Sequence, residues 1–184
     1  LASDSNTLPS SLKAANAIPD GVTRLVVPET LKSIGDGAFY DCKSLTILNL
    51  PDQLTSIGRY AFYGCDKLNK ITLGKSLTTI GEGAFYHCAN LEPLILPDTL
   101  NRIEAMAFHG CNRFTEVTIP DAVNNISHAA FDGCTNLETI TVTEKNGTFA
   151  SIDGVLFNKA GQVLIKCPQT RKGDYQAPPS VTEI

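Results

Sequence analysis

The chain has 184 residues, with 15 Lys and Arg against 19 Asp and Glu and a formal net charge of -4. This mild acidity argues against nucleic acid as a partner, because proteins that bind nucleic acid present a basic patch. No run of about 18 apolar residues occurs, so we expect no insertion of this chain into a membrane. The chain begins at Leu1 without the charged and apolar regions of a signal peptide, and we expect that any such peptide has been removed.

The sequence is organised by a repeat in which the same residue types recur at every twenty-third position. Four of its columns are Phe39, Phe62, Phe85, Phe108 and Phe131; Cys42, Cys65, Cys88, Cys111 and Cys134; Ile34, Ile57, Ile80, Ile103 and Ile126; and Ala38, Ala61, Ala84, Ala107 and Ala130. A period of this length with L-x-x-L-x-L spacing is typical of a leucine-rich-repeat solenoid. We therefore predict one elongated domain. It is a right-handed coil, mostly β with short helical or 3₁₀ turns, with a parallel sheet on its concave face.

Residues 1–21 carry only part of the repeat. Leu8 lies one full period before Leu31, but the Ile and Phe columns are not filled. We expect an N-terminal cap or degenerate repeat, because a solenoid must cover the apolar edge of its first full coil. Residues 10–17, which follow a Pro, are predicted to form a short helix.

Residues 22–142 form the regular repeats, each with two predicted strands. The first is a main strand of L-x-x-L-x-L type whose fourth and sixth residues are apolar, which is the alternation of a strand with one buried face. The predicted main strands are residues 22–27, 45–50, 68–73, 91–96, 114–119 and 137–142. A Pro directly follows most of them, where a residue without an N–H ends the ladder. The L-x-x-I segment that comes next predicts a minor strand on the opposite side of each coil.

Each repeat closes with A-F-x-x-C, for example at residues 61–65. This spacing suits one helical or 3₁₀ turn that inserts the Phe ring into the core, and we expect the rings of successive coils to stack. The Cys of the repeat are predicted to be buried, reduced thiols, because parallel Cβ vectors do not suit a disulfide. No C-x-x-C pair offers zinc ligands, and we expect neither a metal site nor a cofactor.

After the sixth main strand the period fails. The dipeptides at 146–147 (Asn-Gly) and 153–154 (Asp-Gly) are hairpin signals, so we interpret residues 143–174 as an irregular β-hairpin unit. Its predicted antiparallel strands are residues 149–152, 155–157 and 162–166. Residues 175–184 restore the Pro-x-x-Val-x-x-Ile spacing, and we expect them to be the start of a truncated further repeat.

The unit I-P-x-x-V/L-x-x-I-G-x-x-A-F-x-x-C-x-x-L, present at residues 51–68 and 97–114, resembles the BspA-like leucine-rich repeats. Residues 153–168 resemble the hairpin variant that those proteins often carry. The resemblance covers residues 22–184, with departures in single columns such as Gly74 for Pro. It implies a secreted or cell-surface protein, mostly bacterial, that adheres to a protein ligand such as host matrix or another bacterial surface protein.

The third and fifth residues of each main strand point away from the core, onto the concave sheet. Repeat proteins commonly bind partners on this curved face. We predict a protein-binding surface formed by Arg24, Val26, Ile47, Asn49, Lys70, Thr72, Pro93, Ile95, Glu116 and Thr118. Ile47, Pro93 and Ile95 are apolar where solvent alone favours polar residues, although a β-branched preference for strands explains them nearly as well.

Tyr40, Tyr63 and Tyr86 form a second candidate surface, an aromatic row that could stack against a sugar or a protein. The alternative is that these rings lie flat over the coil and cover the edge of the core. His87 and His109 are diagonal neighbours on adjacent coils, but no carboxylate column accompanies them, so we expect solvated loop histidines.

No catalytic constellation is present, so we expect a non-enzymatic, extracellular interaction module. Two alternatives stay open at this point. The repeats could be a mechanical spacer, or they could be a non-catalytic accessory arm of a larger surface protein or enzyme.

Overall fold

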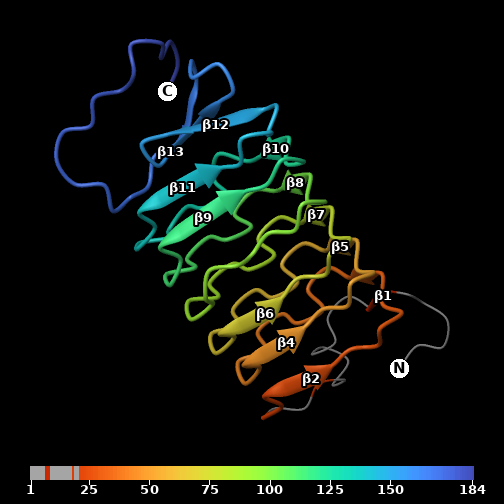
Figure 1. The fold of residues 1–184 in the computed structure, drawn as a ribbon. Coiled ribbons are helices and arrows are strands. Elements are labelled where there is room, and N and C mark those ends of the chain that lie inside the picture. The colour runs from red at the N-terminus through yellow and green to blue at the C-terminus, as the bar shows by residue number, and fades with distance from the viewer. Residues whose placement is uncertain (1–6, 9–17, 19–20) are drawn as a thin grey trace.

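The computed structural model describes residues 7–8, 18 and 21–184 (Figure 1). These residues form a solenoid of short strands and turns in which equivalent positions of successive coils lie side by side. Strands of the regular repeats pair exactly one period apart, as in Leu25 with Leu48 and Leu48 with Ile71. The predicted solenoid of leucine-rich repeats with this period is therefore confirmed. The helix predicted at residues 10–17 lies outside the described residues.

The minor strands form the continuous sheet of the solenoid. They are β3 (Ser33–Ile34), β5 (Ser56–Ile57), β7 (Thr79–Ile80), β8 (Arg102–Ile103) and β10 (Asn125–Ile126), all parallel. β1 (Thr7–Leu8) extends this sheet at its N-terminal edge. Leu8 pairs with Ile34, three positions beyond Leu31, the residue that lies one period after it. A first coil has no preceding coil to match, so its length is free to differ from that of the repeat.

The main strands form two separate sheets. β2 (Arg24–Val26), β4 (Ile47–Asn49) and β6 (Lys70–Thr72) make one parallel sheet, and β9 (Glu116–Ile119) and β11 (Thr139–Val142) make another. Figure 1 draws no strand between β6 and β9 on this side of the solenoid, where residues 91–96 form irregular chain. The strand predicted at residues 91–96 is therefore wrong, because this segment joins neither sheet.

Pro93 accounts for the split between β6 and β9. At the equivalent position of earlier coils, the backbone N–H of Lys70 donates to the carbonyl of Thr46 at 3.2 Å, and that of Ile47 to Thr23 at 3.3 Å. Pro93 has no N–H to make this bond, and proline is poorly tolerated between two strands of a sheet. Its neighbour Glu92 still donates to the carbonyl of Asn69, at 2.9 Å, but the ladder goes no further.

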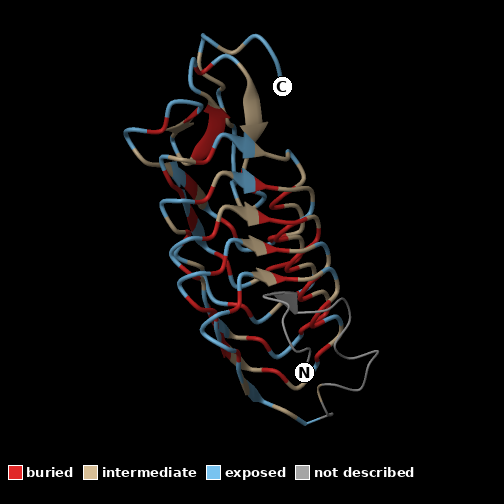
Figure 2. Ribbon diagram, turned by 90° about the vertical axis from the view of Figure 1, so that its right-hand side faces the viewer, coloured by how far each residue is buried: buried red, intermediate tan, exposed pale blue. Residues whose placement is uncertain are grey.

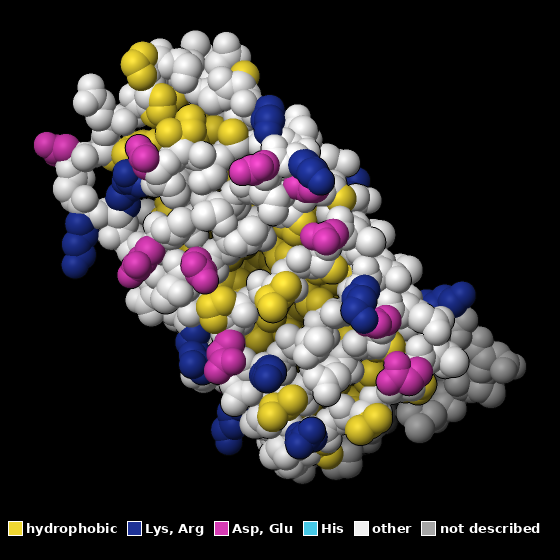
Figure 3. Space-filling model, viewed as in Figure 1, with side chains coloured by type: hydrophobic (Ala, Val, Ile, Leu, Met, Phe, Trp, Pro, Cys, Tyr) yellow, Lys and Arg dark blue, Asp and Glu magenta, His cyan; other side chains and the backbone are white. Residues whose placement is uncertain are grey.

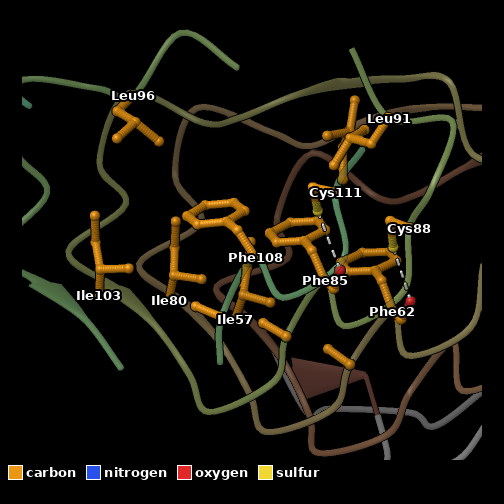
Figure 4. Close-up of a cluster of buried hydrophobic side chains, with 14 of the residues drawn as sticks. Ile57, Phe62, Ile80, Phe85, Cys88, Leu91, Leu96, Ile103, Phe108 and Cys111 are labelled. Carbon is orange, nitrogen blue, oxygen red and sulfur yellow. Dashed lines mark hydrogen bonds between the residues drawn. The ribbon is translucent and has the colours of Figure 1, made fainter. Parts of the chain in front are cut away.

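The core lies inside the coils, where Figure 2 shows buried residues following one another from coil to coil. The Phe column is fully buried and its rings stack with centroids 4.8, 5.1, 5.5 and 5.4 Å apart along the series. Figure 4 shows three of them, Phe62, Phe85 and Phe108, as parallel rings. The predicted stacked spine is confirmed.

The A-F-x-x-C segments form hydrogen-bonded turns, and the described residues contain no helix. Cys42 donates its N–H to the carbonyl of Phe39 at 3.1 Å, which is the i to i+3 pattern of a 3₁₀ turn. The turns also bond to the next coil, as in the 2.7 Å contact from the Phe39 N–H to the carbonyl of Ala61. The predicted single turn of 3₁₀ type is thus confirmed by its hydrogen bond, and it also bonds to the neighbouring coil.

The Cys column is buried, as predicted, and its thiols donate hydrogen bonds to carbonyls of the same turns. Cys88 donates its S–H to the carbonyl of Phe62 at 3.1 Å, and Cys111 to that of Phe85 at 3.3 Å (Figure 4). Each of these Phe carbonyls therefore accepts bonds from its own coil and from the next one. A small side chain with a weak donor suits this site better than a larger apolar one.

The irregular unit is a three-stranded antiparallel sheet of β12 (Phe149–Ile152), β13 (Val155–Asn158) and β14 (Leu164–Lys166). Asp153 and Gly154 form the predicted hairpin turn with φ of 50° and 76°, as a type I′ turn requires. The unit docks on the last regular coil, since the N–H of Ile140 donates to the carbonyl of Gly154 at 2.9 Å. Beyond it, Val181 and Pro178 repeat the turn of the regular coils, and the further repeat stays a prediction.

Asn146 does not form the hairpin turn that its Asn-Gly dipeptide predicted. Its side chain is fully buried, and Nδ2 donates to the carbonyls of Pro120 and Val123 at 2.7 and 2.9 Å. Its Oδ1 accepts the N–H groups of Thr148 and Phe149 at 2.9 and 2.8 Å. One side chain thus joins the last regular coil to the hairpin unit.

We expect Asn146→Ala to lower the free energy of unfolding by about 2–4 kcal/mol, because it leaves buried backbone donors and acceptors without partners. Urea denaturation followed by circular dichroism measures this loss. Asn146→Asp is the matched control: it keeps both acceptor contacts but loses both donors and faces two carbonyls with a negative charge, so it should also destabilise the chain. A loss below about 0.5 kcal/mol in both variants would contradict this role, since that is the range of ordinary surface substitutions.

Candidate binding face

The predicted binding residues lie together on one side of the solenoid, which we call the main-strand face (Figure 3). It comprises Arg24, Val26, Ile47, Asn49, Lys70, Thr72, Pro93, Ile95, Glu116 and Thr118. All are exposed except Ile47, which is half-buried between Arg24 and Lys70 on the neighbouring strands. Val26 and Ile95 are each 93% exposed, which is unusual for large aliphatic side chains.

The face is hollowed where the two main-strand sheets separate. One hollow of about 350 Å³ lies between β6 and residues 92–97, and a second of about 420 Å³ lies between residues 93–98 and β9. Figure 3 shows an apolar floor in the middle of the face at this point. In the part of the chain that the structure describes, the backbone groups of residues 93–96 make no hydrogen bond. The split therefore leaves both free volume and unpaired peptide groups.

The two hollows differ in charge. Lys70, Lys75 and Glu92 line the one beside β6, whereas the one beside β9 is lined by the carboxylates of Asp98 and Glu116 and by no Lys or Arg. Among the described residues, neither of these two carboxylates makes an ion pair or a side-chain hydrogen bond. The C-terminal half of the face is therefore acidic and its anions are available to a partner.

The charges beside β6 are partly satisfied within the protein. Lys75 contacts Asp52 at 2.6 Å, and this hydrogen bond lowers the pKa of the Asp52 carboxyl and raises that of the Lys75 ammonium. Both side chains are well exposed, so the pair contributes little to stability. Glu92 lies 3.4 Å from Arg113. Lys70 is left as the cation of this region that faces solvent without an ion pair within the described residues.

The second candidate surface is a ladder of stacked rings. Tyr40 and Tyr63 stack at 4.6 Å, Tyr63 and Tyr86 at 5.1 Å, and Tyr86 and His109 at 4.5 Å, with interplanar angles of 5 to 10°. The rings cover one another's faces, so between coils only ring edges reach solvent. The rings therefore do not form a row of free faces.

The histidines form an aromatic contact. The rings of His87 and His109 are 5.6 Å apart at an angle of 88°. Burial, together with the neighbouring His87, lowers the pKa of His109, so the imidazole stays neutral in its stack at neutral pH. Among the described residues, no group of three or more His, Cys, Asp or Glu is arranged to hold a metal ion. The same residues include no helix of the length and apolar character needed to cross a membrane.

Sequence reasoning identified the face but missed the split, the hollows and Asp98. The available signal was Pro93, a proline inside a segment otherwise read as a central strand. Asp98 belongs to the column that follows the strand-ending Pro, which also contains Asp52 and Asp121. That column lies outside the strand and was therefore not considered as part of the face.

Comparison with known proteins agrees with this architecture. The family model of the BspA type leucine rich repeat region matches residues 20–138 in six copies. The crystal structure of the pneumococcal vaccine antigen PcpA is similar, with 31% identity and a TM-score of 0.79 over 86% of this chain. A leucine rich cell surface protein from Faecalibacterium prausnitzii is 30% identical over 88% of the chain, with a TM-score of 0.68. The chain spans only 40% and 50% of those two structures.

A leucine-rich repeat protein from Eubacterium ventriosum shares the fold over 95% of this chain and 48% of its own, with 24% identity and a TM-score of 0.80. No curated protein matches the sequence. The similarity of fold extends beyond the residues that the family model matches and so includes the hairpin unit.

Proposed function

The chain belongs to the BspA type leucine-rich repeat family, and from this premise we propose that it is a non-catalytic, extracellular module that binds a protein ligand through its main-strand face. The proposal includes a location on the cell surface or in secreted material and a role in adhesion. The names of the similar structures support it, since one is a vaccine antigen and another a cell surface protein.

One observation carries the proposal. Ile95 is 93% exposed beside two hollows in the middle of the main-strand face. A side chain of this size costs solvation free energy unless a partner covers it, and exposed apolar patches with a polar rim are typical of interaction sites. A β-branched preference for strands does not explain it, because residues 91–96 form no strand.

The face also has the rim that such a site needs. Polar and charged residues surround the apolar centre, with Lys70 and Glu92 toward β6 and Glu116 and Thr118 toward β9. Residues of this kind suppress wrong partners and speed association more than they add affinity. The ring ladder offers less, because its ring faces are already occupied by one another.

The double substitution Ile47→Glu with Ile95→Glu tests the proposal. Neither side chain belongs to the buried core, so folding should be unchanged, while two carboxylates in an apolar contact should weaken ligand binding at least ten-fold. A protein captured by the parent chain from host-matrix or partner-cell extracts serves as ligand, and its affinity is then measured with purified components. Asn125→Glu with Gln53→Glu adds the same charge off the face and is the matched control.

Equal binding by the parent and the face variant would place the site elsewhere, and the edge formed by Tyr40, Tyr63 and Tyr86 would be examined next. Failure of the parent to retain any protein would favour the spacer. If the parent binds and the off-face control loses binding as strongly as the face variant, the effect is one of general charge, which would contradict the proposed surface.

A further inference from the structure

We propose that the hollow between residues 93–98 and β9 binds an extended segment of the protein partner that carries an aliphatic side chain flanked by Lys or Arg. This inference rests on the proposed function. It specifies where on the main-strand face the partner binds and which chemistry it brings.

The first support is the open backbone beside the hollow. The peptide groups of residues 93–96 make no hydrogen bond within the described part of the chain, although they lie between two strands of a solenoid. Unpaired strand-like backbone is the usual docking point for an extended peptide, whose own peptide groups complete the bonding. Pro93 holds the segment in this state, since it removes the N–H that would join it to Asn69.

The second support is apolar volume of the right size. The hollow of about 420 Å³ is bordered by Pro93, Leu94 and Ile95 on one side and by β9 on the other. Pockets that bind small ligands begin at about 300 Å³. An aliphatic side chain placed here covers the exposed Ile95 and fills space that no side chain of the described residues occupies.

The third support is the charge of the rim. Asp98 and Glu116 line this hollow, no Lys or Arg does, and neither carboxylate has a salt-bridge partner among the described residues. Glu116 lies in the register of Pro93, at one end of the segment, and Asp98 lies in the turn that follows Pro97, at its other end. A segment that follows the strands therefore meets one carboxylate at each end of the hollow. Basic residues on both sides of the aliphatic one match this pattern.

The matching probe is a fluorescent peptide with the central sequence Lys-Thr-Leu-Thr-Lys. In an extended conformation both Lys and the Leu share one face. Two control peptides replace Leu by Ser, or both Lys by Glu. Fluorescence anisotropy with the full chain should give binding of the first peptide at least ten-fold tighter than of either control. Equal affinities for the Leu and Ser peptides would overturn the inference.

Two matched substitutions localise the binding. Ile95 and Val26 are both 93% exposed on the main-strand face. Only Ile95 borders the hollow between residues 93–98 and β9. Ile95→Ser should lower the affinity for the peptide at least ten-fold, and Val26→Ser should change that affinity less than two-fold. Pro93→Thr introduces the residue type found at the equivalent position 139 of β11 and restores the missing N–H. This N–H faces Asn69 on the β6 side, away from the hollow beside β9, so peptide binding should stay within two-fold of the parent's.

These outcomes separate the inference from the proposed function. If a captured protein ligand is lost in the Ile47→Glu, Ile95→Glu variant but binds Ile95→Ser like the parent, the face binds as proposed and the hollow is not the site. Should Pro93→Thr fold poorly, Ile95→Ser against Val26→Ser decides alone, and equal effects of these two would contradict the inference. A captured ligand whose affinity is unchanged by every substitution on the main-strand face would refute the proposed function itself.

Discussion

Raising the pH from 8 to 10 is expected to remove several kcal/mol from the free energy of unfolding. Burial raises the pKa of Cys65, Cys88 and Cys111 well above the ordinary thiol range, and that of Cys134 to about 11. The unfolded chain ionises the same thiols near their ordinary value of 9.0. Stability is therefore complete below about pH 8.5 and decreases as the pH rises, because only the unfolded state then loses protons.

Each buried thiol loses about 1.4 kcal/mol over the whole interval from pH 8 to 10, because the unfolded thiol goes from mostly protonated to mostly ionised there, so the four together lose roughly 5 kcal/mol. Urea denaturation at pH 7, 8, 9 and 10 measures it. The matched variant Cys88→Ala gives up the bond to the Phe62 carbonyl and should be less stable at pH 7, yet its loss of stability between pH 8 and 10 should be smaller by about 1.4 kcal/mol. A parent whose stability is flat to pH 10 would contradict the buried column.

The same column predicts the redox state of the thiols. The Cys of the repeat should react slowly with a thiol reagent in the native chain, because the thiolate is the reactive form and burial suppresses it. After denaturation without a reductant, all of them should titrate as free sulfhydryls. A shortfall in this count would indicate disulfides and would contradict the expectation from parallel stacking.

Phe85→Ala should cost about 3–5 kcal/mol, the usual range for truncating a buried aromatic side chain. Phe85 is fully buried and stacks on Phe62 at 5.1 Å and on Phe108 at 5.5 Å. Its coil directly precedes the one in which the main-strand sheet is interrupted. The two halves of the solenoid are joined there by the minor-strand sheet, the turn hydrogen bonds and the Phe stack, and the substitution removes the last of these.

We therefore expect Phe85→Ala to make unfolding less cooperative as well as earlier, since coils of a solenoid contact only their neighbours. Calorimetry and denaturation followed by two probes measure both effects. Phe85→Leu is the control, because it keeps most of the volume and should lose clearly less stability than the Ala variant. A melting curve that is unchanged in Phe85→Ala would refute the stacked core.

Much of the fold could be predicted because identical constraints recur in every coil. The inward Ile of the minor strands, the Phe spine and the Cys column all occupy the positions that the repeat period assigns to them. The Asp153-Gly154 turn was also predictable, because few sequences adopt positive φ at two successive residues. These features depend on local chemistry that repeats.

What departs from the repeat could not be predicted in the same way. Leu91, Leu94 and Leu96 preserve the apolar pattern of a main strand. The repeat pattern therefore predicted a strand here, although Pro93 lacks the N–H that the strand pairing needs. The pairing of Leu8 with Ile34 depends on a coil that has no preceding coil, and the role of Asn146 depends on the distant carbonyls of Pro120 and Val123. The hollows form where backbone hydrogen bonds between neighbouring coils are missing, and the residue types at the repeat positions do not reveal that absence.

The most direct test of the proposed binding face is amide hydrogen exchange of the chain alone and in complex with its captured protein ligand. In the free chain, the amides of residues 94–96 should exchange quickly, because they make no hydrogen bond among the described residues, while those of β9 and β11 exchange slowly. In the complex, residues 94–98 and the start of β9 should become protected. Protection confined to the Tyr40, Tyr63 and Tyr86 edge, with residues 94–98 still exchanging freely, would contradict the main-strand face as the binding surface.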